Sequence, residues 1–170
     1  MELDTVELEY QKLRDEVVSR IEIRSQTIFG VVTLAGVLYS FGISNPVIAL
    51  MYPIVSLFLA ASWTQNDISI KLIGKYIRDE IEPQVPGVKW HTWRVAYAST
   101  STSVFGLRLT SLSAVGVFII TQAVALTIGF AGFRSFTYVG WLVGGLSILF
   151  TFLTVVLLRE YNRHVKTQST

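Results

Sequence analysis

Four long stretches of this chain carry almost no charge. They cover residues 27–44, 46–63, 109–133 and 136–158, and within them and the two short turns that join them in pairs Arg134 is the only Lys, Arg, Asp, Glu or His. Crossing a hydrocarbon layer about 30 Å thick takes roughly 17–25 helical residues. Because backbone amides inside lipid must pair within their own segment, each stretch is predicted to be a transmembrane helix. The expected fold class is an all-α membrane protein with four transmembrane helices.

A cleaved signal peptide or a soluble helical core would account for these apolar stretches less well. A secretory signal peptide would place a short basic segment before its apolar core. Here the first 25 residues hold seven acidic and four basic residues, which indicates a retained N-terminal segment. A soluble protein can bury one such helix, but four of them in 170 residues, with a mean hydropathy of +0.51, leave too little polar surface to cover them.

The distribution of Lys and Arg divides the chain into five segments. We expect a cytoplasmic amphipathic helix over residues 1–26, an antiparallel transmembrane hairpin over 27–63, a cytoplasmic helix and loop over 64–103, a second transmembrane hairpin over 104–158 and a cytoplasmic tail over 159–170. Twelve of the fourteen Lys and Arg residues lie in the first, third and last segments. Since these residues collect on the cytoplasmic side, both termini are predicted to be cytoplasmic in a multi-pass protein of the inner (plasma) membrane.

Both cytoplasmic helices carry apolar residues at spacings of three and four, which is typical of one helix face. In the first helix these residues are Leu3, Val6, Tyr10, Leu13, Val17 and Ile21. In the second, which continues the second membrane helix as far as Pro83, they are Ile68, Leu72, Ile73, Tyr76, Ile77 and Ile81. We expect the two stripes to pack together and the acidic balance of the first helix to complement Lys71, Lys75 and Arg78.

The sequence offers little material for catalysis. It has two histidines, His91 and His164, in unrelated segments, no cysteine, and no metal-binding, phosphate-loop or nucleophile motif. Asp67 and Asp79 are best explained as helix caps or solvated helix positions. We therefore predict that the protein is not an enzyme and that it has no metal site and no cofactor.

Hydroxyl and amide groups are the polar side chains of the membrane helices. The third helix places Thr110, Ser113, Val117 and Thr121 on one face, which is able to line a wetted pore. Ordinary helix packing is the commoner role of a single Ser or Thr. Gln122 belongs with these candidates, because a side-chain amide in hydrocarbon costs several kcal/mol unless it is paired. We expect its partner within the bundle or between subunits.

Small residues on the fourth helix favour self-association. Gly140, Gly144 and Ser147 form a smooth strip along which another helix backbone can approach closely. Four short helices enclose no wide aqueous path, so a pore would have to form between protomers. Conduction therefore implies a homo-oligomer.

A basic stripe with aromatic neighbours marks the middle cytoplasmic segment. Lys71, Lys75 and Arg78 share one helix face, and the loop that follows adds Trp93 and Arg94. Such a stripe binds phosphates and stacks bases, but it also holds a helix on anionic lipid headgroups. Composition alone favours membrane lipids, and a phosphate-bearing ligand is the alternative.

Residues 50–83, with the N-terminal helix, resemble a group of small prokaryotic four-helix membrane proteins. The matching motifs are Tyr52-Pro53, Trp63, Asn66-Asp67, Tyr76-Ile77-Arg78 and Ile81-Glu82-Pro83. Some proteins of this kind are similar to the Hailong-type anti-phage effectors, in which a nucleotidyltransferase partner makes an oligodeoxyadenylate that holds a membrane channel closed. The resemblance implies a homo-oligomeric channel of bacterial anti-phage defence, with a short oligonucleotide bound to the basic stripe on the cytoplasmic side.

Two functions from different classes fit these observations. One is a homo-oligomeric ion channel gated through its cytoplasmic segment, with the face of the third helix as its lining. The other is a non-conducting membrane anchor or scaffold that recruits a soluble partner through its N-terminal helix, where the stripe from Leu3 to Val17 would serve as a coiled-coil seam.

Overall fold

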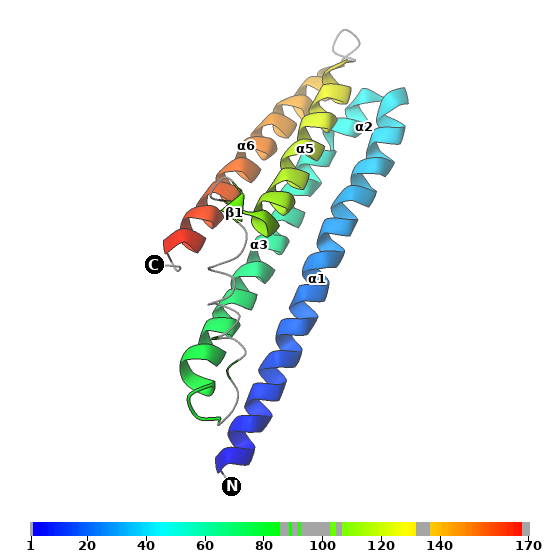
Figure 1. The fold of residues 1–170 in the computed structure, drawn as a ribbon. Coiled ribbons are helices and arrows are strands. Elements are labelled where there is room, and N and C mark those ends of the chain that lie inside the picture. The colour runs from blue at the N-terminus through cyan, green and yellow to red at the C-terminus, as the bar shows by residue number, and fades with distance from the viewer. Residues whose placement is uncertain are drawn as a thin grey trace. The chain divides into compact units, whose positions relative to one another are not determined.

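In its described part, the chain folds into helices and a short β-ribbon. The computed structural model describes residues 2–85, 89, 92, 103–104, 107–131 and 137–167. The ribbon pairs strands β1 (Ser103–Val104) and β2 (Leu107–Arg108) antiparallel, with Ser103 opposite Arg108. The helices, drawn in Figure 1, are α1 (Glu2–Ser44), α2 (Pro46–Leu50), α3 (Tyr52–Tyr76), the π-helix η1 (Ile77–Ile81), α5 (Leu109–Ala131) and α6 (Tyr138–Thr167).

Four helical stretches of the described chain are long and apolar enough to cross a membrane, as the sequence predicts. They are Thr5–Ser44, Pro46–Ile81, Ser113–Ala131 and Tyr138–Arg163. By length and composition this is a multi-pass, all-helical membrane protein. The second stretch has 36 residues and, at about 1.5 Å per residue, is longer than a hydrocarbon layer is thick. We therefore assign its charged end, from Gln65 onward, to the part outside the hydrocarbon.

The chain forms two compact units, and α1 and α3 contribute residues to both. The charged unit comprises Met1–Ser25 and Gln65–Thr110, and the membrane unit comprises Gln26–Thr64 and Ser111–Thr170. The division falls where the charges of the two helices end, since Arg24 is the last charged residue of α1 and Asp67 is the first of α3.

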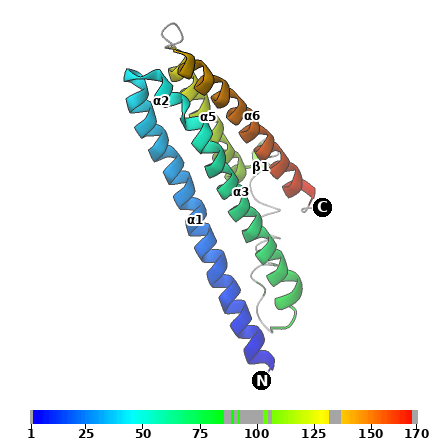
Figure 2. The same cartoon turned by 180° about the vertical axis from the view of Figure 1, so that it is seen from behind.

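Aromatic rings fill the interior of the membrane unit. Tyr52 and Phe118 are fully buried. The ring of Trp63 makes edge contacts with those of Phe118 and Tyr161, at centroid distances of 6.3 and 5.4 Å. Figures 1 and 2 show the membrane-unit parts of α1, α3, α5 and α6 running alongside one another. The space between these helices is therefore packed with side chains.

A tight turn at Asn45 joins α1 to α2. The Asn45 side-chain oxygen accepts a hydrogen bond from the backbone N–H of Val47 at 3.2 Å, and Pro46 occupies the first turn of α2, as predicted. A Cβ atom added to Gly42 would lie 2.7 Å from the Cβ of Ala49. The chain reverses this closely because position 42 carries no side chain.

Apolar residues of α1, α3 and η1 form the core of the charged unit. Val17, Ile70, Ile77 and Ile81 are buried. The predicted stripe is wrong at Leu72 and Tyr76, which are 50% and 44% exposed. Leu72 lies about 200° around the helix from Ile70, so the two side chains cannot share the buried face.

The π-helix η1 is a feature that the periodicity does not predict. Its last turn is closed by the N–H of Glu82, which donates to the carbonyl of Ile77 at 2.8 Å, five residues earlier. The next residue, Pro83, has no N–H with which to continue an α-helix. Ile77 and Ile81, the first and last residues of η1, are both buried.

Candidate functional site

A buried amide joins three helices of the membrane unit. Gln122 of α5 has no exposed surface, and neither have Ser56 of α3 and Thr154 of α6. The Nε2 of Gln122 donates hydrogen bonds to the hydroxyl oxygens of Ser56, at 2.9 Å, and Thr154, at 3.1 Å. Of the two partners that the sequence allowed, within the bundle or between subunits, the described contacts are within the bundle.

Two tyrosines extend this polar layer to α1. The hydroxyl of Tyr52 donates to Oγ1 of Thr121 at 2.8 Å, and the hydroxyl of Tyr39 donates to the Thr121 backbone carbonyl. The two rings meet edge to face at 5.6 Å. Thr121 itself donates to the carbonyl of Val117 at 2.6 Å. A phenol in hydrocarbon needs a partner, so a Tyr inside a charge-free stretch is the sequence signal for this layer.

The predicted pore face of α5 is therefore divided. Gln122 is fully buried and Thr121 is half-buried, and both bond to groups inside the membrane unit; their role as pore lining stays a prediction. Ser113 lies at the surface and Val117 is half-buried. The side chain of Thr110 is outside the described part of the chain.

The predicted small-residue strip of α6 packs inside the same protomer. Gly140 and Gly144 are buried, and a Cβ on Gly144 would lie 3.4 Å from the ring of Phe130. Ser147 donates hydrogen bonds to the carbonyls of Leu50 and Val143, the second at 2.8 Å. This face is occupied by α2 and α5, so the close approach that small residues permit is made within the chain.

The outer surface of the membrane unit differs between α1 and α6. On α1, Gln26, Thr33 and Ser40 recur every seven residues, lie on one line and are exposed. A Cβ on Gly36, beside this line, would meet no atom within 4 Å. Large apolar side chains are exposed beside this line on α1, namely Phe29, Val32, Val37, Phe41 and Ile43, and they also cover the surface of α6, at Leu142, Leu146, Leu149, Phe152, Leu153 and Val156. Lipid suits the second surface, whereas small and hydroxyl residues are typical of contacts between membrane helices.

Asp67 is the centre of an ion-paired cluster in the charged unit. Its side chain is 7% exposed and accepts from Nη1 of Arg24 and Nζ of Lys71, each at 2.6 Å. The expectation that Asp67 caps a helix is wrong, because α3 runs without interruption from Tyr52 to Tyr76. The sequence predicts that acidic residues of α1 pair with basic residues of α3. In the Arg24–Asp67 pair the charges are the other way round, because α1 supplies the cation and α3 the carboxylate.

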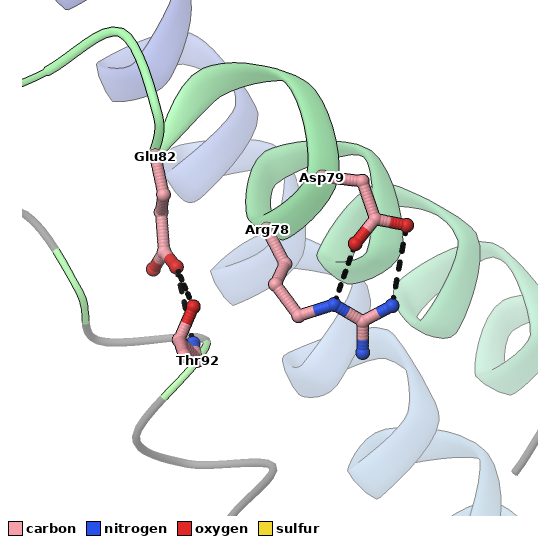
Figure 3. Close-up of polar contacts among 4 residues, drawn as sticks. All are labelled: Arg78, Asp79, Glu82 and Thr92. Carbon is pink, nitrogen blue, oxygen red and sulfur yellow. Dashed lines mark hydrogen bonds and ion pairs between the residues drawn. The ribbon is translucent and has the colours of Figure 1, made fainter.

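Arg78, a predicted ligand residue, is paired with its neighbour Asp79 (Figure 3). The guanidinium Nε lies 2.6 Å from Oδ1 of Asp79 and a second nitrogen lies 3.2 Å from Oδ2. This hydrogen bond raises the pKa of Arg78 and lowers the pKa of Asp79 from their ordinary values. Lys75, in the last turn of α3, and Lys89, in the segment after η1, are exposed.

A buried carboxylate holds the segment that leads to the other ligand candidates. Glu82 is 7% exposed and accepts two hydrogen bonds from Thr92, from its backbone N–H at 3.1 Å and its hydroxyl at 2.5 Å (Figure 3). Trp93 and Arg94 come directly after Thr92 in the sequence but lie outside the described residues. The sequence does not predict the pairing of Glu82 with Thr92, since a carboxylate and a hydroxyl ten residues apart form no motif.

The described side chains include no group of three or more His, Cys, Asp or Glu residues arranged to hold a metal ion. No protein-family model, no curated protein and no solved structure matches this chain.

Proposed function

We propose that this protein is a homo-oligomeric ion channel of a bacterial plasma membrane, gated through its charged unit by an anionic ligand. In this proposal the four spans form two antiparallel hairpins, and both termini and the charged unit lie in the cytoplasm. The resemblance to Hailong-type effectors extends the proposal to anti-phage defence and to a short oligonucleotide, a nucleotidyltransferase product, as the ligand.

The polar outer line of α1 is the observation that supports this proposal. In a lone protomer, Gln26, Thr33 and Ser40 would face lipid together with apolar side chains of α1 such as Phe29 and Phe41. The interior of the unit is filled by Tyr52 and Phe118, so water has no wide path through one protomer. A path lined by α1 between protomers accounts for both facts, with Ser113, Val117 and Thr110 of α5 as further lining candidates.

Ligand binding in this proposal is a competition between anions. Lys71 and Arg78 already pair with carboxylates, of which Asp79 is exposed and Asp67 is buried. A phosphate can displace Asp79 from the Arg78 guanidinium far more easily than it can displace Asp67 from Lys71. Lys75 and Lys89, which are exposed, would add to the phosphate contacts, and Trp93 and Arg94 would stack on a base.

Ion flux in liposomes tests the channel and its lining together. The purified protein is reconstituted with a potential-sensitive dye and compared with empty liposomes. We expect flux, and we expect Thr33→Leu to lower it about tenfold by removing a wetted hydroxyl. Leu149→Ile on the surface of α6 is the matched control and should leave flux unchanged. Equal flux from all three proteins would remove α1 from the lining.

If no flux is observed, a second experiment is needed, because a bound ligand would also hold the channel shut. Ultraviolet absorbance of the denatured protein at the nucleotide maximum would reveal a co-purified oligonucleotide. Its absence, together with no flux, would contradict conduction. Where a short oligonucleotide binds, the pair Lys75→Gln and Lys89→Gln should weaken it several-fold and make its affinity less dependent on salt.

A scaffold is the second candidate, and one observation favours it. Leu8 and Val18 of α1 are 52% and 59% exposed in the charged unit, which would lie in water. Val17 of the predicted seam is instead buried against the chain itself. If α1 docks a soluble protein, Val18→Glu should prevent that protein from co-purifying in a stoichiometric amount. The same change at Lys12, which is already exposed and charged, should not.

A further inference from the structure

One atom of the buried polar layer has no hydrogen-bond donor. It is Oε1 of Gln122, on a side chain with no exposed surface, and no described group lies within hydrogen-bond reach of it. An amide oxygen has two lone pairs and, in hydrocarbon, no lipid group that can donate to them. Leaving a buried acceptor unpaired costs free energy that a neighbouring hydroxyl would ordinarily recover.

The hydroxyls bonded to this layer have partners other than this oxygen. Each hydroxyl has one hydrogen, and Thr154 gives its hydrogen to the carbonyl of Phe150 at 2.9 Å. The Tyr52 hydroxyl gives its hydrogen to Thr121. The Ser56 hydroxyl accepts from Nε2, at the other end of the same amide.

Exchanging the amide oxygen and nitrogen of Gln122 does not remove the problem. The oxygen would then face Ser56 and Thr154, and Thr154 already gives its hydrogen to the Phe150 carbonyl. The two N–H groups would take the position without partners, which leaves two donors unpaired in place of one acceptor. In either orientation one end of the amide lacks a partner.

A second unpartnered group lies one helical turn away from Thr154. The hydroxyl of Thr151 is buried and has no hydrogen-bond partner. Ser147 and Thr154, on the same helix, each donate to the carbonyl four residues earlier. Thr151 and Thr154 are three residues apart and therefore share one side of α6. The same side thus holds a Gln122 contact and an unused hydroxyl.

We infer that Gln122 and Thr151 form an internal hydration site of the membrane unit. A water molecule supplies what both groups lack, since it donates to the amide oxygen and also exchanges hydrogen bonds with a hydroxyl. This inference stands whether or not the protein conducts ions.

Cysteine accessibility tests the site directly, because the chain has no cysteine of its own. Thr151→Cys places a thiol at the site with little change in volume. A small water-soluble methanethiosulfonate reacts with thiolate, which forms only where water reaches the sulfur. Leu149→Cys, two residues away on the exposed surface of α6, reports the same depth in lipid. We expect the thiol at 151 to react at least about tenfold faster than the thiol at 149.

The amide is tested by Gln122→Met, a change of similar volume, in the Thr151→Cys background. Without the acceptor, labelling should fall to the rate of the Leu149→Cys control. Equal rates for the two single variants, or a rate that Gln122→Met leaves unchanged, would overturn the hydration site. If Thr151→Cys does not assemble, Ser56→Cys reports the site from the other side of the amide, with the same expected and contrary results.

Discussion

Helices α1 and α3 contribute residues to both the charged unit and the membrane unit, yet the side-chain interactions that join the two helices differ between the units. In the charged unit, α1 and α3 meet through an ion pair between Arg24 and Asp67. In the membrane unit they meet through the rings of Tyr39 and Tyr52 and through hydroxyl groups. A carboxylate is tolerated where water covers part of the pair, whereas in hydrocarbon a neutral hydroxyl costs less to bury. The solvent thus decides which polar group joins the helices.

Breaking the Asp67 cluster should have the largest effect. Asp67→Asn leaves Arg24 and Lys71 beside a neutral amide, so we expect a loss of about 3 kcal/mol from the charged unit. Urea unfolding of the detergent-purified protein, followed by circular dichroism, measures it. Asp79→Asn is the control and should leave stability almost unchanged, because its pair with Arg78 is exposed. Similar losses from both variants would mean that burial of Asp67 is unimportant.

The stability of the membrane unit should depend on close packing rather than on charge. Gly42→Ala puts a Cβ 2.7 Å from that of Ala49, which has no rotamer with which to move away, and should cost about 2 kcal/mol. Gly36→Ala on the same helix meets no atom within 4 Å and should be neutral in the protomer. Thermal unfolding at low and high salt compares them. A salt-dependent loss in Gly42→Ala would contradict the distinction between the two units.

The Glu82 contact should have a smaller, local effect. Thr92→Val removes the hydroxyl donor but keeps the backbone N–H, and the segment that carries Lys89 should open more often. We expect trypsin to cut after Lys89, which is exposed, about fivefold faster. Thr92→Ser keeps both donors and should be cut at the original rate. Equal cleavage of all three proteins would show that Glu82 does not hold this segment.

The smallest effect should come from pH. The hydrogen bond to Glu9 raises the pKa of Tyr76 above its ordinary value of 10.0. This contact therefore adds stability below about pH 10, and the contribution falls as the pH rises through the folded-state pKa. The difference in melting temperature between the protein and Tyr76→Phe should be small at pH 8 and should shrink at higher pH. A difference that grows with pH would reverse the assignment of donor and acceptor.

Sequence patterns predict the four membrane spans because charge is excluded from lipid along a whole helix. They do not predict the exposed side of Leu72 or the π-turn after Tyr76, which depend on a packing partner and on hydrogen bonds five residues apart. Gln122 illustrates both cases. Its need for a partner follows from its chemistry, but the identity of Ser56 and Thr154 depends on how α3 and α6 are rotated.

The site predictions depend on contacts that the sequence does not reveal. A stripe of Gly and Ser, or of Thr and Gln, fits a contact inside one protomer as well as a contact between protomers. Gly144 and Ser147 belong to the first kind. The exposed line of Thr33 and Ser40 becomes visible only once the inner face of α1 is known. The basic stripe is similar, since sequence does not reveal that Arg78 has a carboxylate partner.

The π-turn makes this helix end tolerant of a one-residue deletion. A π-helix corresponds to an α-helix that has gained one residue, so removing a single residue between Ile77 and Ile81 would restore α geometry. Each residue of an α-helix accounts for about 100° of rotation, so the same deletion within α3 would turn every later side chain of the helix away from its partner. At the π-turn the deletion is absorbed locally, and Glu82 would keep its direction toward Thr92. Homologues that are one residue shorter should have the gap at this turn and should keep the contact of that carboxylate.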